Sequence, residues 1–188
     1  MPRRAGHALH LRYAKLPMLP GHGFRAVVTP VPERVLNRST WRPGCPVRAT
    51  DLRWIRLTFW GFDHSRHTGE LLVNARVADE MVGVFRSLYR ARFPIEQMVI
   101  ASRRDLAAPP TGDGNGTGAF VCRQTVGATY FSQHAYGLAV DINTFQNPYI
   151  NGGLVLPELA GAYRDRGRRA PGMIHPGDVV TQAFARIG

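Results

Sequence analysis

Lysine, cysteine and long apolar runs are scarce in this sequence of 188 residues, and each shortage limits what the protein can be. Lys15 is the only lysine, so the formal net charge of +11 comes almost entirely from arginine. No run of 18 apolar residues occurs, which predicts that no segment spans a membrane. The N-terminus begins with the basic residues Arg3 and Arg4, but histidines and further basic residues follow instead of an apolar core. This pattern predicts no clear signal peptide.

The remaining composition is that of an ordinary globular domain, with 44% hydrophobic and 20% charged residues. Its excess of positive charge favours anionic partners such as cell-wall glycopolymers, nucleic acid or an anionic membrane. A nucleic-acid site would combine clustered basic residues with exposed aromatic residues on one element. Here the arginines are dispersed, apart from four within residues 164–169. A solvated basic surface is therefore the preferred interpretation, and no specific nucleic-acid partner is expected.

Short strands and single helices follow one another along the chain. Alternating apolar residues indicate a strand over residues 52–60. Asn74 can cap a helix that ends before Pro94, and Asp178 opens a final amphipathic helix. Further strands are predicted over residues 71–73, 98–101, 120–123 and 138–142. Since the strands and helices do not alternate regularly, we predict an α+β fold with a small, mainly antiparallel sheet and flanking helices.

Two parts of the chain differ in character. Residues 1–40 contain prolines, glycines and scattered basic residues without a period, which predicts an irregular N-terminal arm. Residues 41–188 carry the periodic segments and are predicted to form one domain.

The most informative motif is Ser-x-His-x-x-Gly-x-Ala-x-Asp at residues 132–141. On one continuous strand His134 and Asp141 would point to opposite faces, but a turn at Gly137 can reset the direction. A carboxylate in such an apolar run requires a cation or strong donors, and zinc held by His134 and Asp141 would satisfy it. The alternative is a core histidine with ordinary partners and an aspartate at the end of a strand.

The motif resembles the first metal-ligand motif of the zinc D-alanyl-D-alanine carboxypeptidase and L-alanyl-D-glutamate peptidase family, which has the hedgehog/DD-peptidase fold. The flanking residues 119–123 and 147–149 are similar as well, and the likeness extends over roughly residues 40–188. The resemblance implies a zinc metallopeptidase that cuts peptidoglycan peptides, located outside the cytoplasm or in the cell wall. It also implies that His134 and Asp141 are zinc ligands.

Two more residues match positions with a role in that family. Arg123 matches an arginine that polarises the scissile carbonyl and stabilises the oxyanion, a task that suits a permanently charged guanidinium. Ser132 matches a serine that contacts the terminal carboxylate of the substrate. The alternatives are a surface arginine at a strand end and a turn hydroxyl that bonds its own backbone.

The family pattern also requires a third zinc ligand, a histidine with an acidic general base three positions before it. None of the seven histidines in this sequence has an acidic residue at that spacing. We therefore expect a domain that lacks its C-terminal segment, and such a chain would itself be inactive. His175 is a possible substitute ligand or an ordinary loop histidine, and His64 and His67 lie in a predicted polar loop. The competing hypothesis is a non-catalytic pseudoenzyme that binds the cell wall.

The two cysteines, Cys45 and Cys122, form either one disulfide or two buried thiols. Similarity to exported enzymes leaves the two alternatives about equal, because spacing along the sequence does not show whether the two Cα atoms meet. A disulfide would stabilise the fold by about 4 kcal/mol in the chain-entropy model.

Overall fold

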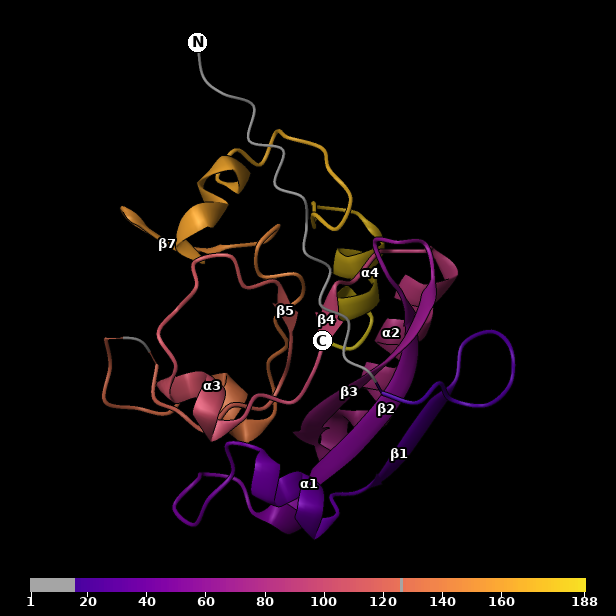
Figure 1. The fold of residues 1–188 in the computed structure, drawn as a ribbon, viewed down its shortest axis with the longest axis vertical. Helices are drawn as coiled ribbons and strands as arrows, with labels where there is room; N and C mark the ends of the chain where they lie inside the picture. The colour runs from indigo at the N-terminus through magenta and orange to yellow at the C-terminus, as the bar shows by residue number, and fades with distance from the viewer. Residues whose placement is uncertain (1–15, 126) are drawn as a thin grey trace.

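The fold is organised around a three-stranded antiparallel sheet, seen in the computed structural model of Figure 1, which describes residues 16–125 and 127–188. The strands are β1 (Ala26–Pro30), β2 (Leu52–Trp60) and β3 (Arg66–Asn74), in the order β1-β2-β3. Helix α2 (Ala78–Arg90) packs on β2, and α4 (Val179–Ala185) packs beside α2. The predicted α+β class with a mainly antiparallel sheet is confirmed.

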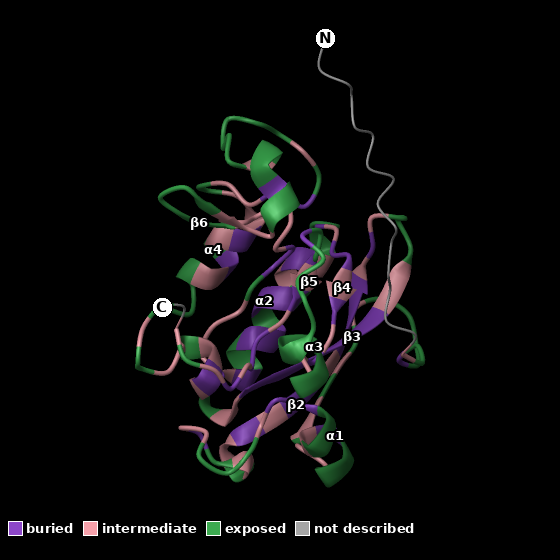
Figure 2. Cartoon of the chain, turned by 60° about the vertical axis from the view of Figure 1, so that its left-hand side comes forward, coloured by how far each residue is buried: buried purple, intermediate pink, exposed green. Residues whose placement is uncertain are grey.

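The sheet is covered on both faces because its two long strands carry apolar residues on both sides. Ile55 and Leu57 face α2, in one core cluster, whereas Leu52 and Trp54 belong to a second cluster on the opposite face. This second cluster also contains Phe120 and Cys122 from the later part of the chain. Figure 2 shows buried residues concentrated in the sheet and α2, and exposed residues in the outer helices and loops. The second cluster thus attaches the segment before the candidate site to a rigid surface.

The predicted cap at Asn74 and the predicted stop before Pro94 are both present, but α2 itself begins only at Ala78. The Asn74 side chain accepts a hydrogen bond from the Arg76 backbone N–H and opens a short 3₁₀ turn, Ala75–Val77, that leads into α2. After Arg90 the chain turns through Arg92, which has a positive φ of 53°, and reaches Pro94, which cannot continue a helix. The cap on α4 is confirmed too, since the Asp178 side chain accepts from the Thr181 backbone N–H.

Part of the predicted N-terminal arm is regular structure, which corrects the expectation of an irregular segment up to residue 40. Residues 26–30 form β1 and pair with β2, and residues 33–38 form helix α1 (Glu33–Arg38). Phe24 and Val28 pack against the main core, and Val35 of α1 is buried. Each residue of this edge strand is exposed or only half-buried, which is why its apolar pattern in the sequence is weak. Residues 1–15 of the predicted arm lie outside the described residues.

The strands predicted over residues 120–123 and 138–142 are wrong as strands. Among the described residues, the strand-type pairings in or beside these segments are isolated bridges, Gly118 with Asp141 and Gln124 with Phe131. Their backbone groups bond to several unrelated segments instead of one neighbouring strand, as when the Phe120 N–H donates to the carbonyl of Leu72. The strand predicted over residues 98–101 is reduced to β4 (Gln97–Met98), which pairs in parallel with β5 (Gly116–Thr117).

Several small elements were not predicted. They are a 3₁₀ turn before β2 (Ala49–Asp51), helix α3 (Arg103–Ala107), a 3₁₀ helix (Gln133–Tyr136), the hairpin of β6 (Tyr149–Asn151) and β7 (Leu154–Leu156), and a 3₁₀ helix (Glu158–Tyr163). Among the helices of residues 16–125 and 127–188, none has the length and apolar character that crossing a membrane requires.

Candidate metal centre

The four residues singled out from the sequence line one cleft of about 950 Å³. They are Arg123, Ser132, His134 and Asp141. The cleft is also lined by the chain after α3, with residues 108–112, and by the region of the β6–β7 hairpin, with residues 156–158. Residues as far apart in the sequence as Asp105 and Glu158 therefore share one concave surface, as a binding site requires.

His134 lies in the 3₁₀ helix Gln133–Tyr136, in place of the strand considered from the sequence. The Ser132 side chain caps this helix by accepting from the His134 backbone N–H at 3.3 Å. Gly137 ends it in the left-handed conformation with φ 70°. Its carbonyl accepts from the Asn74 N–H, and a side chain on Gly137 would place its Cβ only 2.6 Å from that nitrogen. The glycine is thus required both for its conformation and for its contact with the end of β3.

One short segment, residues 118–119, orients both candidate ligands. The backbone of Gly118 and the backbone of Asp141 exchange two hydrogen bonds, at 3.0 and 2.9 Å. The carbonyl of Ala119 lies 2.6 Å from Nδ1 of His134, so Nδ1 carries the proton and donates it there. This leaves Nε2 as the free ring nitrogen, directed at Asp141. A histidine held by a backbone carbonyl in this way is typical of metal sites.

The free donor atoms of the pair have the spacing of two corners of a zinc site. His134 Nε2 and Asp141 Oδ2 are 3.4 Å apart. In a tetrahedral site with bonds of about 2.0–2.2 Å, neighbouring donors are separated by roughly 3.3–3.5 Å. The His134 side chain is 13% exposed and that of Asp141 56%, so the pair opens toward the cleft. The residues therefore fit two positions of such a site.

The contact with Asp141 also acts on the protonation of His134. The hydrogen bond to Asp141 raises the pKa of His134 above its ordinary value, although burial of the ring acts in the opposite direction. The carbonyl of Ala119 also favours the protonated ring, and the charge of Arg123 disfavours it.

Arg123 and Ser132 are neighbours in the wall of the cleft. The Ser132 N–H donates to the Arg123 carbonyl at 3.1 Å. The Arg123 guanidinium donates to the carbonyl of Gln124 and otherwise faces the cleft, which it lines. The Ser132 hydroxyl fills the turn role that the sequence left open, and its own hydrogen can still be donated to a ligand.

Within residues 16–125 and 127–188, no group of three or more His, Cys, Asp or Glu side chains could hold a metal ion. His175 is not among the residues that line the cleft; its backbone N–H donates to the Asp178 cap. Burial, followed by the charges of Arg169 and Arg166, lowers the pKa of His175. His64 lies in the predicted loop, whereas His67 belongs to β3, which corrects the prediction for that residue. Nε2 of His67 lies 3.0 Å from both carboxylate oxygens of Asp63.

Sequence reasoning assigned no role to several polar residues that line the cleft, among them Asp105, Asn147 and Glu158. A capping-box pattern could have revealed Asp105, because its side chain and that of Ser102 bond each other's backbone N–H at the start of α3. Asn147 stood only as part of the flanking sequence. Glu158 has no recognisable local signal, since its place in the cleft depends on the fold around it.

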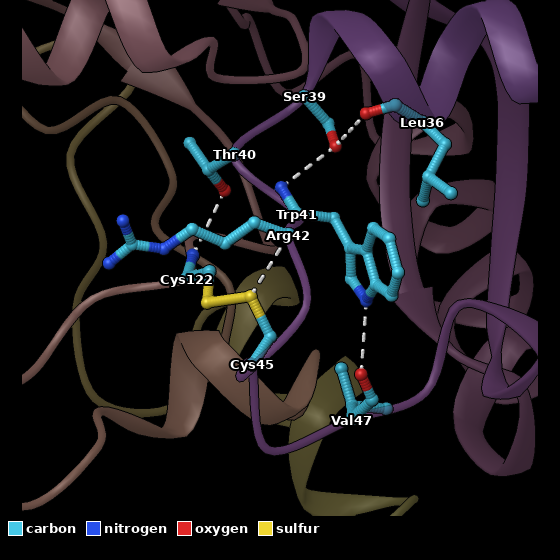
Figure 3. Close-up of a disulfide and its surroundings, with 8 residues drawn as sticks. All are labelled: Leu36, Ser39, Thr40, Trp41, Arg42, Cys45, Val47 and Cys122. Atoms are coloured by element: carbon cyan, nitrogen blue, oxygen red, sulfur yellow. Dashed lines mark hydrogen bonds between the residues drawn. A yellow bond between two sulfur atoms is a disulfide. The ribbon is translucent and has the colours of Figure 1, made fainter.

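Cys45 and Cys122 form a disulfide, with Cα atoms 5.9 Å apart. Figure 3 shows that it joins the loop of residues 39–47 to the backbone next to Arg123. The same loop holds this backbone a second time, because the Cys122 N–H donates to the Thr40 hydroxyl at 2.9 Å. The indole of Trp41 donates to the Val47 carbonyl and closes the loop on itself. The disulfide therefore anchors the wall that carries Arg123.

Comparison with known proteins gives one finding. The family described as D-alanyl-D-alanine carboxypeptidase matches residues 125–188, a segment that contains Ser132, His134 and Asp141 and begins just after Arg123. No curated protein and no solved structure matches the chain. Residues 125–188 are thus similar to the D-alanyl-D-alanine carboxypeptidase family, and this segment contains the motif at residues 132–141 on which the predicted resemblance rests.

Proposed function

We propose that this protein is a zinc-dependent peptidase that hydrolyses peptidoglycan peptides next to D-amino acids. The observation that carries the proposal is the spacing of His134 Nε2 and Asp141 Oδ2, 3.4 Å, inside a cleft and inside the segment that matches the family. Two donors at this spacing suit adjacent corners of a tetrahedral zinc site. The proposal extends to the cofactor and the substrate class, which the family match by itself leaves open.

His134 and Asp141 would hold the ion, and the Ala119 carbonyl keeps the proton on Nδ1 so that Nε2 stays free to coordinate. A bound zinc ion would lower the pKa of a coordinated water and polarise the scissile carbonyl. Arg123 would donate to the carbonyl oxygen as negative charge develops on it, which a fixed guanidinium does without reorganisation. Ser132 would donate its hydroxyl hydrogen to the terminal carboxylate of the peptide.

The surroundings of the site support a small peptide substrate outside the cytoplasm. A volume of about 950 Å³ is at the upper end for small-molecule clefts and accommodates a short peptide. The Cys45–Cys122 disulfide is typical of proteins that fold in oxidising compartments. Peptidoglycan peptides meet both conditions.

A zinc titration of the metal-free protein beside its His134→Ala and Asp141→Ala variants tests the metal site. We expect one-to-one binding in the starting protein and its loss in both variants, because each change removes one donor atom. His64→Ala serves as the control, since His64 lies in a loop outside the cleft. Unchanged zinc content in both site variants would refute the assignment.

A second candidate is a module that binds cell-wall peptides without cutting them. It is favoured by the lack of a third metal-binding side chain near the pair within the described part of the chain. No acidic residue stands three positions before any histidine either. Calorimetry with a muropeptide, followed by analysis of the peptide, separates the two candidates. Binding that survives a chelator and produces no cleavage would favour the binding module, whereas cleavage that the chelator abolishes favours the peptidase.

A further inference from the structure

Asn147 lines the cleft, yet its side chain faces inward and joins three separate segments. Its Nδ2 donates to the carbonyl of Ile142 at 3.0 Å and to that of Gly172 at 2.9 Å. Its Oδ1 accepts from the Ile174 N–H at 2.8 Å and from the Arg166 guanidinium at 3.1 Å. An asparagine amide has two donor hydrogens and one acceptor oxygen, so this set uses its full capacity. Asn147 consequently has no polar group left for a substrate.

Arg166 completes this arrangement with a guanidinium surrounded by neutral oxygens. Besides Asn147, it donates to the backbone carbonyls of Gln146 at 2.9 Å, Tyr163 at 3.3 Å and Ile174. The planar group presents several donors in a fixed geometry, which allows one side chain to connect several chain segments. Arg166 therefore ties the loop after Asp141 to the segment before α4. We call Asn147 and Arg166 together the amide clamp.

The amide clamp acts on the backbone that directly follows Asp141. It holds the carbonyl of Ile142, the next residue, and the Asn147 N–H donates to the carbonyl of Asn143. Asn143 is fully buried with φ 46°, and its Nδ2 donates to the carbonyls of Pro94 and Gly172. Gly118 holds the backbone of Asp141 itself. The amide clamp and Asn143 hold the backbone that follows Asp141.

The Asp141 carboxylate has little other support. Its side chain is 56% exposed, and within residues 16–125 and 127–188 the contact that the structure records for it is with His134. Its position therefore depends on the direction of its own backbone. A rotation of that backbone would move Oδ2 away from Nε2 and change the 3.4 Å spacing.

We propose that Asn147 and Arg166 are positioning residues that hold Asp141 at the metal-binding distance from His134. This inference rests on the proposed function, since it gives the clamp a role in binding zinc. Supporting residues behind metal ligands typically change metal affinity by about 10–100-fold when they are replaced. Arg166 lies 25 positions from Asp141 in the sequence, and only the fold makes it part of the site.

Arg166→Met tests the proposal, with Arg164→Met as the matched control. Arg164 is an exposed arginine two positions away for which the structure records no side-chain hydrogen bond. Two quantities are measured for each variant: zinc affinity, by competition with a chelator, and hydrogen exchange of the Asp141 amide in the metal-free protein. We expect Arg166→Met to weaken zinc binding by about 10–100-fold and to accelerate exchange at Asp141. Arg164→Met should leave both within twofold of the starting protein.

Equal zinc affinity in the Arg166→Met variant and the starting protein would overturn the proposal. If the starting protein binds no zinc, the proposed function fails, and the exchange measurement then decides the inference alone. Unchanged exchange at Asp141 would refute the clamp, whereas faster exchange confined to residues 141–147 would support it. Should Arg166→Met fail to fold, Arg166→Lys replaces it, because lysine keeps the charge but cannot reach several oxygens at once. The zinc affinity of Arg166→Lys is then expected to lie between that of the Arg164→Met control and that of the Asp141→Ala variant.

Discussion

At the scale of single residues, the candidate site consists of the His134 ring and the Asp141 carboxylate, with one space between their facing atoms. Nε2 of His134 and Oδ2 of Asp141 are close enough for a proton or a metal ion to occupy that space, but not both. Zinc binding should therefore weaken as the pH falls and His134 becomes protonated. The hydrogen bond to Asp141, which raises the pKa of His134, extends this competition to higher pH.

Asp141→Asn should lower the pKa of His134 in the metal-free protein, because it removes the main cause that raises it and leaves the effect of burial. An NMR titration of the histidine rings measures the change. Asp79→Asn is the control, since it removes a carboxylate at the start of α2, outside the cleft. An unchanged His134 titration in Asp141→Asn would contradict the assigned hydrogen bond.

The same shift determines how the stability of the metal-free protein depends on pH. A raised pKa in the folded state stabilises the fold fully below the unfolded value of about 6.5. This contribution is lost as the pH rises through the folded pKa. The stability difference between the starting protein and Asp141→Asn should therefore shrink toward alkaline pH.

At the scale of elements, the turn after His134 is determined by backbone conformation and by contact with β3. Gly137→Ala should destabilise the protein by at least about 1–2 kcal/mol, the cost of the left-handed conformation. A further cost comes from the Cβ at 2.6 Å from a backbone nitrogen, which cannot move as a side chain would. Urea unfolding of the variant measures the loss.

Gly83→Ala provides the opposite case within the same protein. Gly83 lies in α2, and a Cβ there would meet no atom within 4 Å. Because alanine is the better helix former, this variant should be stabilised by up to about 1 kcal/mol. Equal effects of the two substitutions would mean that the turn at Gly137 does not have the described conformation.

At the scale of the whole molecule, the disulfide joins residues that are 77 positions apart. Cys45→Ser with Cys122→Ser should lower the free energy of unfolding by about 4 kcal/mol, since the unfolded chain regains the entropy of a long loop. Guanidinium unfolding of the double variant gives the value, and the starting protein under reducing conditions should behave alike. A loss of less than about 1 kcal/mol would indicate that the bond adds little constraint.

The Cys45→Ser, Cys122→Ser double variant should lose stability but keep most of its zinc affinity. The disulfide anchors the wall that carries Arg123, whereas His134 and Asp141 are oriented by residues 118–119 and by the turn at Gly137. The disulfide therefore stabilises the fold as a whole, whereas the geometry of His134 and Asp141 depends on local contacts.

Local patterns in the sequence determined β2, α2 and the cap of α4. In each case a residue and its near neighbours contain the physical cause: alternation along a strand, the Asn74 and Asp178 side chains beside free N–H groups, and Pro94 after the helix. The motif at residues 132–141 likewise contains both candidate ligands and the glycine between them. These features need no distant partner, so they can be predicted without a structure.

Only the tertiary structure decided the rest. The segments at residues 120–123 and 138–142 have the composition of strands, but their backbone bonds go to Leu72, His134 and other distant residues, so no strand forms. The Cys45–Cys122 bond and the contact of Arg166 with Asn147 also join distant positions. Such contacts depend on how the chain returns to the sheet, and composition and spacing along the sequence do not contain that information.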